Sequence, residues 1–117
     1  MSGIARKRIV EAYVDEQGKT PVREWIEELK DAKARVRIKH RIAKLKEGLL
    51  GDYKFIGEGV WELRIHLRPG YRVYFAEVDQ SLLLLLCGGT KKTQHKDIKQ
   101  AKYFLEQYIR RTDHEKD

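Results

Sequence analysis

The segment that decides the fold spans residues 59–109, with GVWELRIHL at 59–67, YRVYFAEV at 71–78 and SLLLLLC at 81–87, followed by GGTKKTQHK at 88–96 and DIKQAKYFLEQYI at 97–109. Apolar and polar residues alternate in the first two stretches, as they do in strands. The third is apolar at every position from Leu82 to Leu86 and predicts a central strand covered on both faces. Turn residues at Pro69-Gly70 and Asp79-Gln80 join the three strands into two hairpins.

These hairpins are expected to gather basic residues at one end of the sheet. A three-residue loop over 68–70 would keep the apolar faces matched and would place His66 opposite Arg72. Two reversals of direction bring the loop after Cys87 back to the same edge, where Gly88-Gly89 allows a sharp exit. The alternation puts Trp61, Leu63, Ile65 and Leu67 on the core side and Glu62, Arg64, His66 and Arg68 on the outward side.

The N-terminal half predicts one strand and two helices. Residues 4–14 are rich in β-branched and apolar types and indicate a first strand. Thr20 followed by Pro21 is typical of a helix start, and Asp31 can cap a second helix. The expected buried stripes are Val22, Trp25, Ile26 and Leu29 on the first helix, Ala34, Ile38, Ile42, Leu45 and Leu49 on the second, and Ile98, Ala101, Leu105 and Tyr108 on the last.

The predicted order is therefore β-α-α-β-β-β-α. We expect a single α+β domain over residues 1–117, with the helices on one side of an antiparallel sheet. Its single cysteine, Cys87, excludes an intrachain disulfide and is expected to pack as a small apolar residue in a cytoplasmic protein. The run Leu82–Cys87 is too short to cross a bilayer, so no membrane association is expected.

The charge balance favours a polyanionic partner. The chain has 25 lysines and arginines against 18 acidic residues, a net charge of +7. Residues 30–46 alone hold eight basic residues and one aspartate, which is the same net charge. Such a surface suits nucleic acid or an acidic protein, although a basic helix face can also be merely solvated.

The residue types at the predicted sheet end suit cleavage of RNA by its own 2′-hydroxyl. That reaction needs a base, an acid and cations around the phosphorus, which histidine, arginine and lysine can supply. Each candidate could also be an ordinary exposed residue. The catalytic candidates are Arg64, Arg72, Lys91, Lys92 and His95, and the RNA-binding candidates are Lys39, Arg41, Lys44, Lys46, His66 and Lys96. No zinc spacing or phosphate loop is present and the carboxylates are scattered, so neither a metal nor a cofactor is expected.

Four segments together resemble the RelE/ParE toxin superfamily, and its HigB-like branch in particular. They are V-W-E-L-R-I, G-Y-R-V-Y-F, L-L-L-L-C-G-G-T-K-K-T-Q and A-K-Y-F-L-E. The resemblance implies a RelE-like fold and the toxin of a type II toxin–antitoxin pair, with a helix-turn-helix antitoxin of the HigA type as partner. RelE and HigB members cut mRNA on the ribosome without a metal.

On that model Arg64 and Arg72 match strand arginines that contact phosphate, and Lys92 or Lys91 matches the basic position after the last strand. A tyrosine or histidine near the final helix often transfers protons in such enzymes, and that position here holds Ile98. ParE members share the fold but act on DNA gyrase. Two alternatives therefore stay open, a gyrase inhibitor and a non-catalytic module that binds RNA or protein.

Overall fold

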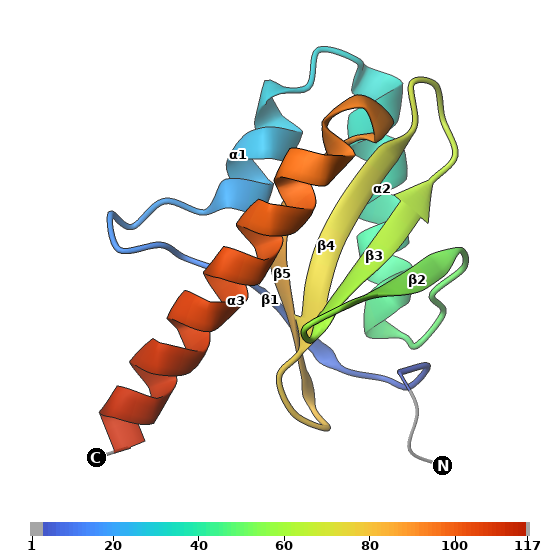
Figure 1. Ribbon diagram of the computed structural model, residues 1–117. Coiled ribbons are helices and arrows are strands. Elements are labelled where there is room, and N and C mark those ends of the chain that lie inside the picture. The colour runs from blue at the N-terminus through green and yellow to red at the C-terminus, as the bar shows by residue number, and fades with distance from the viewer. Residues whose placement is uncertain (1–3, 117) are drawn as a thin grey trace.

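Five strands form one mixed sheet in the computed structural model, which describes residues 4–116. The elements are β1 (Ile9–Ala12), α1 (Pro21–Glu28), α2 (Ala32–Lys46), β2 (Tyr53–Gly57), β3 (Val60–Ile65), β4 (Tyr71–Glu77), β5 (Leu82–Thr90), the 3₁₀ turn η1 (Lys91–Thr93) and α3 (Gln94–Lys116). The strand order is β1-β5-β4-β3-β2, and Figure 1 shows the sheet from the side on which α3 lies. Strand β1 runs parallel to β5, so the predicted fully antiparallel sheet is wrong, while the α+β class is confirmed.

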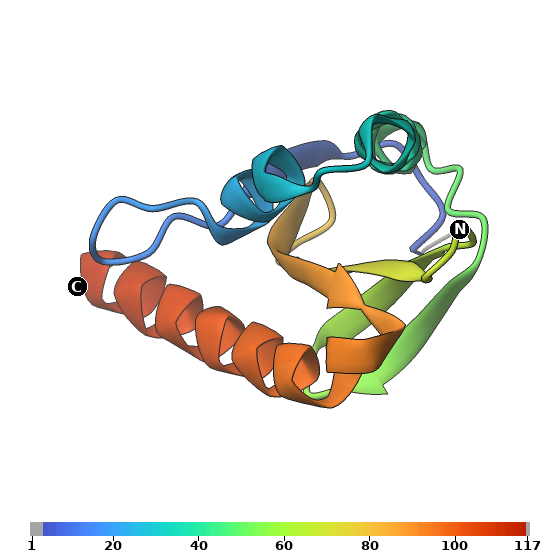
Figure 2. The same cartoon turned by 90° about the horizontal axis from the view of Figure 1, so that it is seen from above.

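Helices cover both faces of this sheet, which corrects the expectation that they lie on one side. Figure 2 shows α1 and α2 on one side of the strands and α3 on the other. One core cluster joins the first two helices to Val73 and Phe75 of β4, and a second joins α3 to Tyr74 and Ala76 of the same strand. Strand β4 is therefore buried on both faces, as is β5, whose central position was predicted correctly. Within the described part of the chain, no helix is long and apolar enough to cross a membrane.

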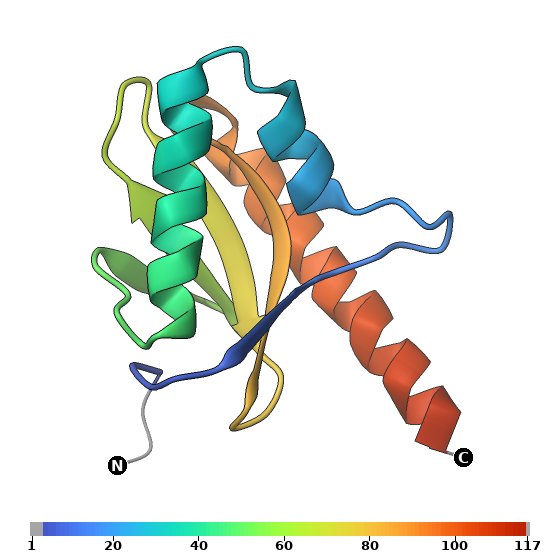
Figure 3. The same ribbon diagram turned by 180° about the vertical axis from the view of Figure 1, so that it is seen from behind.

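The two N-terminal helices begin where the sequence predicted. Helix α1 starts at Pro21 after Thr20, although the Thr20 hydroxyl makes no capping hydrogen bond. The Asp31 carboxylate accepts hydrogen bonds from the backbone N–H groups of residues 33 and 34 at the start of α2. Figure 3 shows α2 lying along the back of the sheet. Helix α2 ends at Lys46, so Leu49 leaves the buried stripe and is 59% exposed, contrary to the prediction.

The β3–β4 hairpin has the predicted parity but a different register. Arg64 lies opposite Arg72, and Ile65 lies opposite Tyr71, so residues 66–70 form the loop. Hydrogen bonds from the Leu67 N–H to the Ile65 carbonyl and from the Gly70 N–H to the Leu67 carbonyl close this loop early. They remove His66 from the strand ladder, which is why it does not lie opposite Arg72.

Three strand limits also differ from the prediction. Strand β1 covers Ile9–Ala12 rather than residues 4–14, and β2 was not predicted at all. Strand β5 continues through Gly88 and Gly89, so these glycines do not form the expected sharp exit. An added Cβ would lie 2.2 Å from Trp25 Cε3 at Gly88 and 1.7 Å from the Asp97 carboxylate at Gly89. The pair of glycines thus lets α1 and α3 approach the two faces of β5.

Candidate functional site

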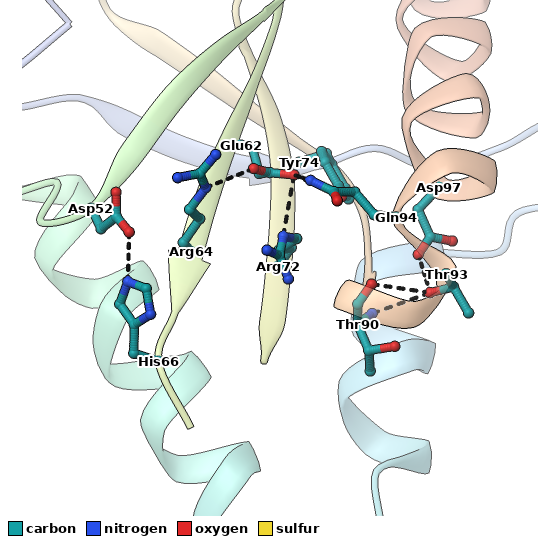
Figure 4. Close-up of polar contacts among 10 residues, drawn as sticks. All are labelled: Asp52, Glu62, Arg64, His66, Arg72, Tyr74, Thr90, Thr93, Gln94 and Asp97. Carbon is teal, nitrogen blue, oxygen red and sulfur yellow. Dashed lines mark hydrogen bonds and ion pairs between the residues drawn. The ribbon is translucent and has the colours of Figure 1, made fainter. Parts of the chain in front are cut away.

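A buried carboxylate, that of Glu62 on β3, lies at the centre of the basic sheet end (Figure 4). Arg64 donates to it from Nε at 2.9 Å, Tyr74 from its hydroxyl at 3.0 Å and Gln94 from Nε2 at 2.7 Å. Arg72 adds an ion pair, with its Nε 3.4 Å from Glu62 Oε2. The alternating pattern had placed Glu62 on an outward face, and this is wrong because α3 covers that face of the sheet.

The contacts around Glu62 keep its carboxyl ionised. Burial raises the pKa of this group, but the hydrogen bonds from Arg64, Gln94 and Tyr74 and the charge of Arg72 outweigh burial and hold the pKa below its ordinary value. The same arrangement shifts the pKa of Tyr74 in the opposite direction. Burial and the neighbouring Glu62 carboxylate raise the pKa of the Tyr74 hydroxyl far above its ordinary value, so this phenol stays protonated near neutral pH.

Glu62 contacts both arginines at their Nε atoms, with a hydrogen bond from Arg64 and a longer ion pair to Arg72, whose buried Nε makes no hydrogen bond. Arg64 and Arg72 occupy directly paired positions on β3 and β4, and their side chains are 30% and 13% exposed. Within residues 4–116, the Nη atoms of both guanidinium groups have no hydrogen-bond partner. These are the atoms with which an arginine binds two oxygens of a phosphate. Glu62 thus contacts one side of each guanidinium group and leaves the Nη side without a partner among these residues.

Lys91 lies beside this pair, at the start of η1. Its backbone N–H donates to the Gly70 carbonyl at 2.9 Å. A Cβ added at Gly70 would lie 3.5 Å from Arg72 Nη1 and 3.6 Å from Lys91 Cβ, which places both side chains next to the same loop residue. The structure thus brings together Arg64, Arg72 and Lys91, residues that are distant in sequence. Their catalytic roles stay predictions.

The other three candidates after β5 are exposed on η1 and the first turn of α3. They are Lys92, His95 and Lys96. The turn that carries them is well fixed, because Thr93 accepts from the Thr90 N–H at 3.2 Å and donates to the Asp97 carboxylate. Among the described residues, none of the three has an ion pair or side-chain hydrogen bond. Their roles in RNA binding or proton transfer stay predictions.

The basic residues of α2 occupy a different surface from the two arginines. Lys39, Lys44 and Lys46 are exposed on a helix that packs against the face opposite α3, as the view in Figure 2 shows. Arg41 does not belong to that exposed set. Its guanidinium donates to the carbonyls of Arg64, Leu50 at 2.6 Å and Asp52 at 3.2 Å, and burial lowers its pKa. Its guanidinium donors therefore already bind the backbone, and a role of Arg41 in RNA binding stays a prediction.

His66 lies at the start of the β3–β4 loop and is paired with a residue that sequence reasoning missed. Its Nε2 is 2.5 Å from Oδ2 of Asp52, the residue before β2. Glu62, Tyr74 and Gln94 were also missed. A signal existed for the first two, because Glu62 and Arg64 share a strand face and correct hairpin parity places Tyr74 on it as well. Asp52 and Gln94 gave no comparable signal.

The arrangement is suited to holding a phosphate group by charge and geometry. Two guanidinium groups and one carboxylate leave a net positive charge, to which the exposed lysines after β5 add. Within the described residues, no three His, Cys, Asp or Glu side chains are grouped so as to hold a metal ion. The thiol of Cys87 is buried, and burial raises its pKa to about 12, so it does not supply a thiolate.

Comparison with known proteins gives one family and one relative. Residues 24–106 match the family described as phage derived protein Gp49-like. An uncharacterized protein of Haemophilus influenzae is 46% identical over 83 residues, which cover 71% of this chain and 84% of that protein. The family match includes the whole Glu62 cluster and Lys91.

Proposed function

This chain belongs to the Gp49-like family of phage-derived proteins, and from that premise we propose that it is the toxin of a type II toxin–antitoxin pair. In this proposal the protein cleaves mRNA on the ribosome and needs no metal. The 2′-hydroxyl of one nucleotide attacks the adjacent phosphodiester, and the products are a cyclic phosphate and a 5′-hydroxyl. The resemblance to HigB-like toxins supports this activity, and so does the chemistry of the Glu62 cluster.

The proposal rests on one observation, which is that Glu62 contacts the paired arginines, Arg64 and Arg72, at their Nε atoms. The pentacoordinate phosphorus of the transition state carries more negative charge than the starting phosphodiester. Donors that are already oriented toward that charge stabilise it without reorganisation. Arg64 and Arg72 meet this requirement because Glu62 holds Arg64 by a hydrogen bond and Arg72 by an ion pair at their Nε atoms and leaves the Nη atoms available. Lys91 and Lys92 follow immediately after β5 and extend the positive surface.

The exposed lysines of α2 form a second basic surface, and this surface favours an acidic protein as partner. Lys39, Lys44 and Lys46 lie across the sheet from the arginine pair, so RNA bound at the pair does not have to cover them. A helix-turn-helix antitoxin with an acidic segment could bind these lysines, and charge complementarity would speed its association. RNA on the ribosome could also contact them, which makes the lysines a shared surface in this proposal.

The test is primer extension on mRNA in a purified translation reaction, with Arg72→Ala as the variant. Loss of a charge-assisted phosphate contact worth roughly 1.5–3 kcal/mol should lower cleavage at least about tenfold. Arg110→Ala is the matched control, because Arg110 is exposed on the distal half of α3 and pairs only with Glu106. Message that stays intact with the wild-type protein, at concentrations that arrest growth, would reject the nuclease.

A second function, inhibition of DNA gyrase, is favoured by the burial of the arginines. Arg72 is only 13% exposed and pairs with Glu62, a state that a purely structural arginine also adopts. A toxin of this kind would block supercoiling without cutting RNA. A supercoiling assay run beside the translation assay separates the two functions, because each predicts activity in one assay alone.

A further inference from the structure

His66 and Asp52 form a carboxylate–imidazole pair at the edge of the proposed phosphate site. The distance from His66 Nε2 to Asp52 Oδ2 is 2.5 Å, and the His66 side chain is 75% exposed. The two residues are brought together from the β3–β4 loop and the segment before β2 (Figure 4). Because the pair is exposed, it should contribute little to the free energy of unfolding, and what it can contribute is the orientation of the imidazole.

The pairing fixes which ring nitrogen is available. An ionised carboxylate only accepts hydrogen bonds, so Nε2 carries the proton that it donates to Asp52. In the neutral imidazole the other nitrogen, Nδ1, is then a proton acceptor. Among the described residues Nδ1 has no partner. The ring is therefore held in one tautomer, with its basic nitrogen accessible to a substrate.

Backbone and electrostatic contacts place this pair next to Arg64. The Arg64 N–H donates to the Asp52 carbonyl at 2.9 Å, and Arg41 binds the carbonyls of both residues from α2. The charge of Asp52 also contributes, after that of Glu62, to raising the pKa of the Arg64 guanidinium. The segment that carries Asp52 is thus fixed to the strand that carries one of the two phosphate-binding arginines.

We propose that His66, oriented by Asp52, is the general base that removes the 2′-hydroxyl proton of an RNA whose phosphodiester is bound by Arg64 and Arg72. This inference rests on the proposed nuclease function and adds its base. The 2′-oxygen forms a bond to phosphorus while the bond from phosphorus to the 5′-oxygen breaks. The proton moves from the 2′-hydroxyl to Nδ1, and the leaving 5′-oxygen takes a proton from water. His66 then returns its proton to solvent, which completes the cycle.

Other proton-transfer candidates fit the role less well. Tyr74 is fully buried and stays protonated, and the Cys87 thiol is buried with a raised pKa. His95 is exposed on the first turn of α3 and has no carboxylate partner among the described residues. Among the candidates that the structure describes, His66 combines exposure, an orienting carboxylate and a backbone connection to Arg64.

Several elements bring charged and titratable groups to the loop that carries His66. They are Asp52 before β2, Arg64 on β3, Arg68 in the loop itself, and Arg41, Lys33, Arg37 and His40 on α2, the last three along a groove that Leu67 also lines. Asp52 is the only carboxylate in this set, so it is the group that can accept the Nε2 proton of His66 and orient the ring.

The experiment measures mRNA cleavage against pH for wild type, His66→Ala and Asp52→Asn. General-base catalysis contributes typically 10²- to 10⁴-fold, so His66→Ala should lower the rate at least about a hundredfold and remove the rising limb of the pH profile. Asp52→Asn should also lower the rate, because a neutral amide holds the Nε2 proton, and so the ring orientation, less strongly than a carboxylate does. Arg110→Ala is the control, because Arg110 is exposed on α3, pairs with Glu106 and lies outside the groups that surround His66. Added imidazole should partly restore His66→Ala, since the site is open to solvent.

A substrate with sulfur in place of the leaving 5′-oxygen separates a base from an acid, because a thiolate leaves without protonation. The His66→Ala defect should persist on this substrate, and its disappearance would show that His66 is the acid and overturn the inference. Equal rates and profiles for wild type and His66→Ala would overturn it too, while the nuclease would stand. Absence of cleavage by the wild type would reject the nuclease and the inference together. Unchanged thermal unfolding of His66→Ala checks that the fold is intact.

Discussion

Replacing Glu62 with glutamine should destabilise the fold, because it removes a buried charge and nearly preserves the shape. The carboxylate accepts from Arg64, Tyr74 and Gln94 and pairs with Arg72. A glutamine offers one accepting oxygen and one donating amide group. The Tyr74 hydroxyl can rotate and the Gln94 amide can turn over to accept from the new donor, but the buried Nε of Arg72 can only donate and loses the carboxylate opposite it.

The expected loss in the free energy of unfolding follows from the contacts of Glu62 that a glutamine cannot replace. Hydrogen bonds to charged groups contribute about 1.5–3 kcal/mol and neutral ones about 0.5–1.5 kcal/mol, so the Arg64 contact loses roughly 1 kcal/mol. Arg72, whose side chain is 13% exposed, loses the one counter-ion that it has among the described residues, which adds about 1–2 kcal/mol. We expect Glu62→Gln to lower the free energy of unfolding by about 2–3 kcal/mol at pH 7, less than complete removal of one member of a buried pair.

Urea unfolding followed by the fluorescence of Trp25 and Trp61 measures this difference. With a slope of about 1–3 kcal/mol per molar urea, the midpoint should fall by roughly 0.7–3 M. Glu106→Gln is the control, because it breaks an exposed pair with Arg110 and should cost less than about 0.5 kcal/mol.

The pH dependence gives a second check on the same variant. Because the pKa of Glu62 is lowered in the folded protein, its contribution is fully present above the unfolded pKa, roughly 4.3, and is lost as the pH falls through the folded value. The difference in the free energy of unfolding between wild type and Glu62→Gln should therefore decrease as the pH is lowered from 7 toward 3. A difference below about 0.5 kcal/mol at pH 7, or one that stays constant with pH, would refute the reasoning.

Three further predictions concern the framework. Asp31→Ala removes the cap of α2 and should lower the free energy of unfolding by about 1 kcal/mol in urea titrations. Gly88→Ala puts a methyl group 2.2 Å from the Trp25 ring and should cost about 1–3 kcal/mol in thermal unfolding, and an unchanged midpoint would contradict the close approach. Cys87 is buried with a raised thiol pKa, so a thiol reagent should label the native protein far more slowly than the urea-unfolded chain, and equal rates would contradict its burial.

Much of the fold could be predicted because local rules determine it. Proline after Thr20 and the Asp31 carboxylate gave the starts of α1 and α2, and parity of apolar residues gave the faces of β3 and β4. Strand direction carries no such local signal, so the parallel pairing of β1 with β5 was missed. Strand β2 was missed because its side chains are largely exposed and do not alternate clearly.

The error about the helix layers could have been avoided from the sequence itself. A strand that is apolar from Leu82 to Leu86 needs cover on both faces, and helices on one side of the sheet cannot provide it. The same reasoning would have placed α3 across the sheet from α2, and hence over the face that carries Glu62. Alternation alone shows which residues share a face, whereas burial of that face depends on what packs against it.

The candidate site was predicted by residue type, but the group that organises it was not. Arg64, Arg72 and Lys91 were expected to meet because hairpin geometry brings their strands' ends together, and the structure places them so. From the sequence alone, Glu62 among basic residues indicated a strand face exposed to solvent, not the centre of a buried cluster. Because Glu62 both stabilises the fold and orients the arginines, Glu62→Gln should reduce RNA cleavage even at temperatures where it remains folded. A folded Glu62→Gln protein with full cleavage activity would show that the arginines do not need this orientation.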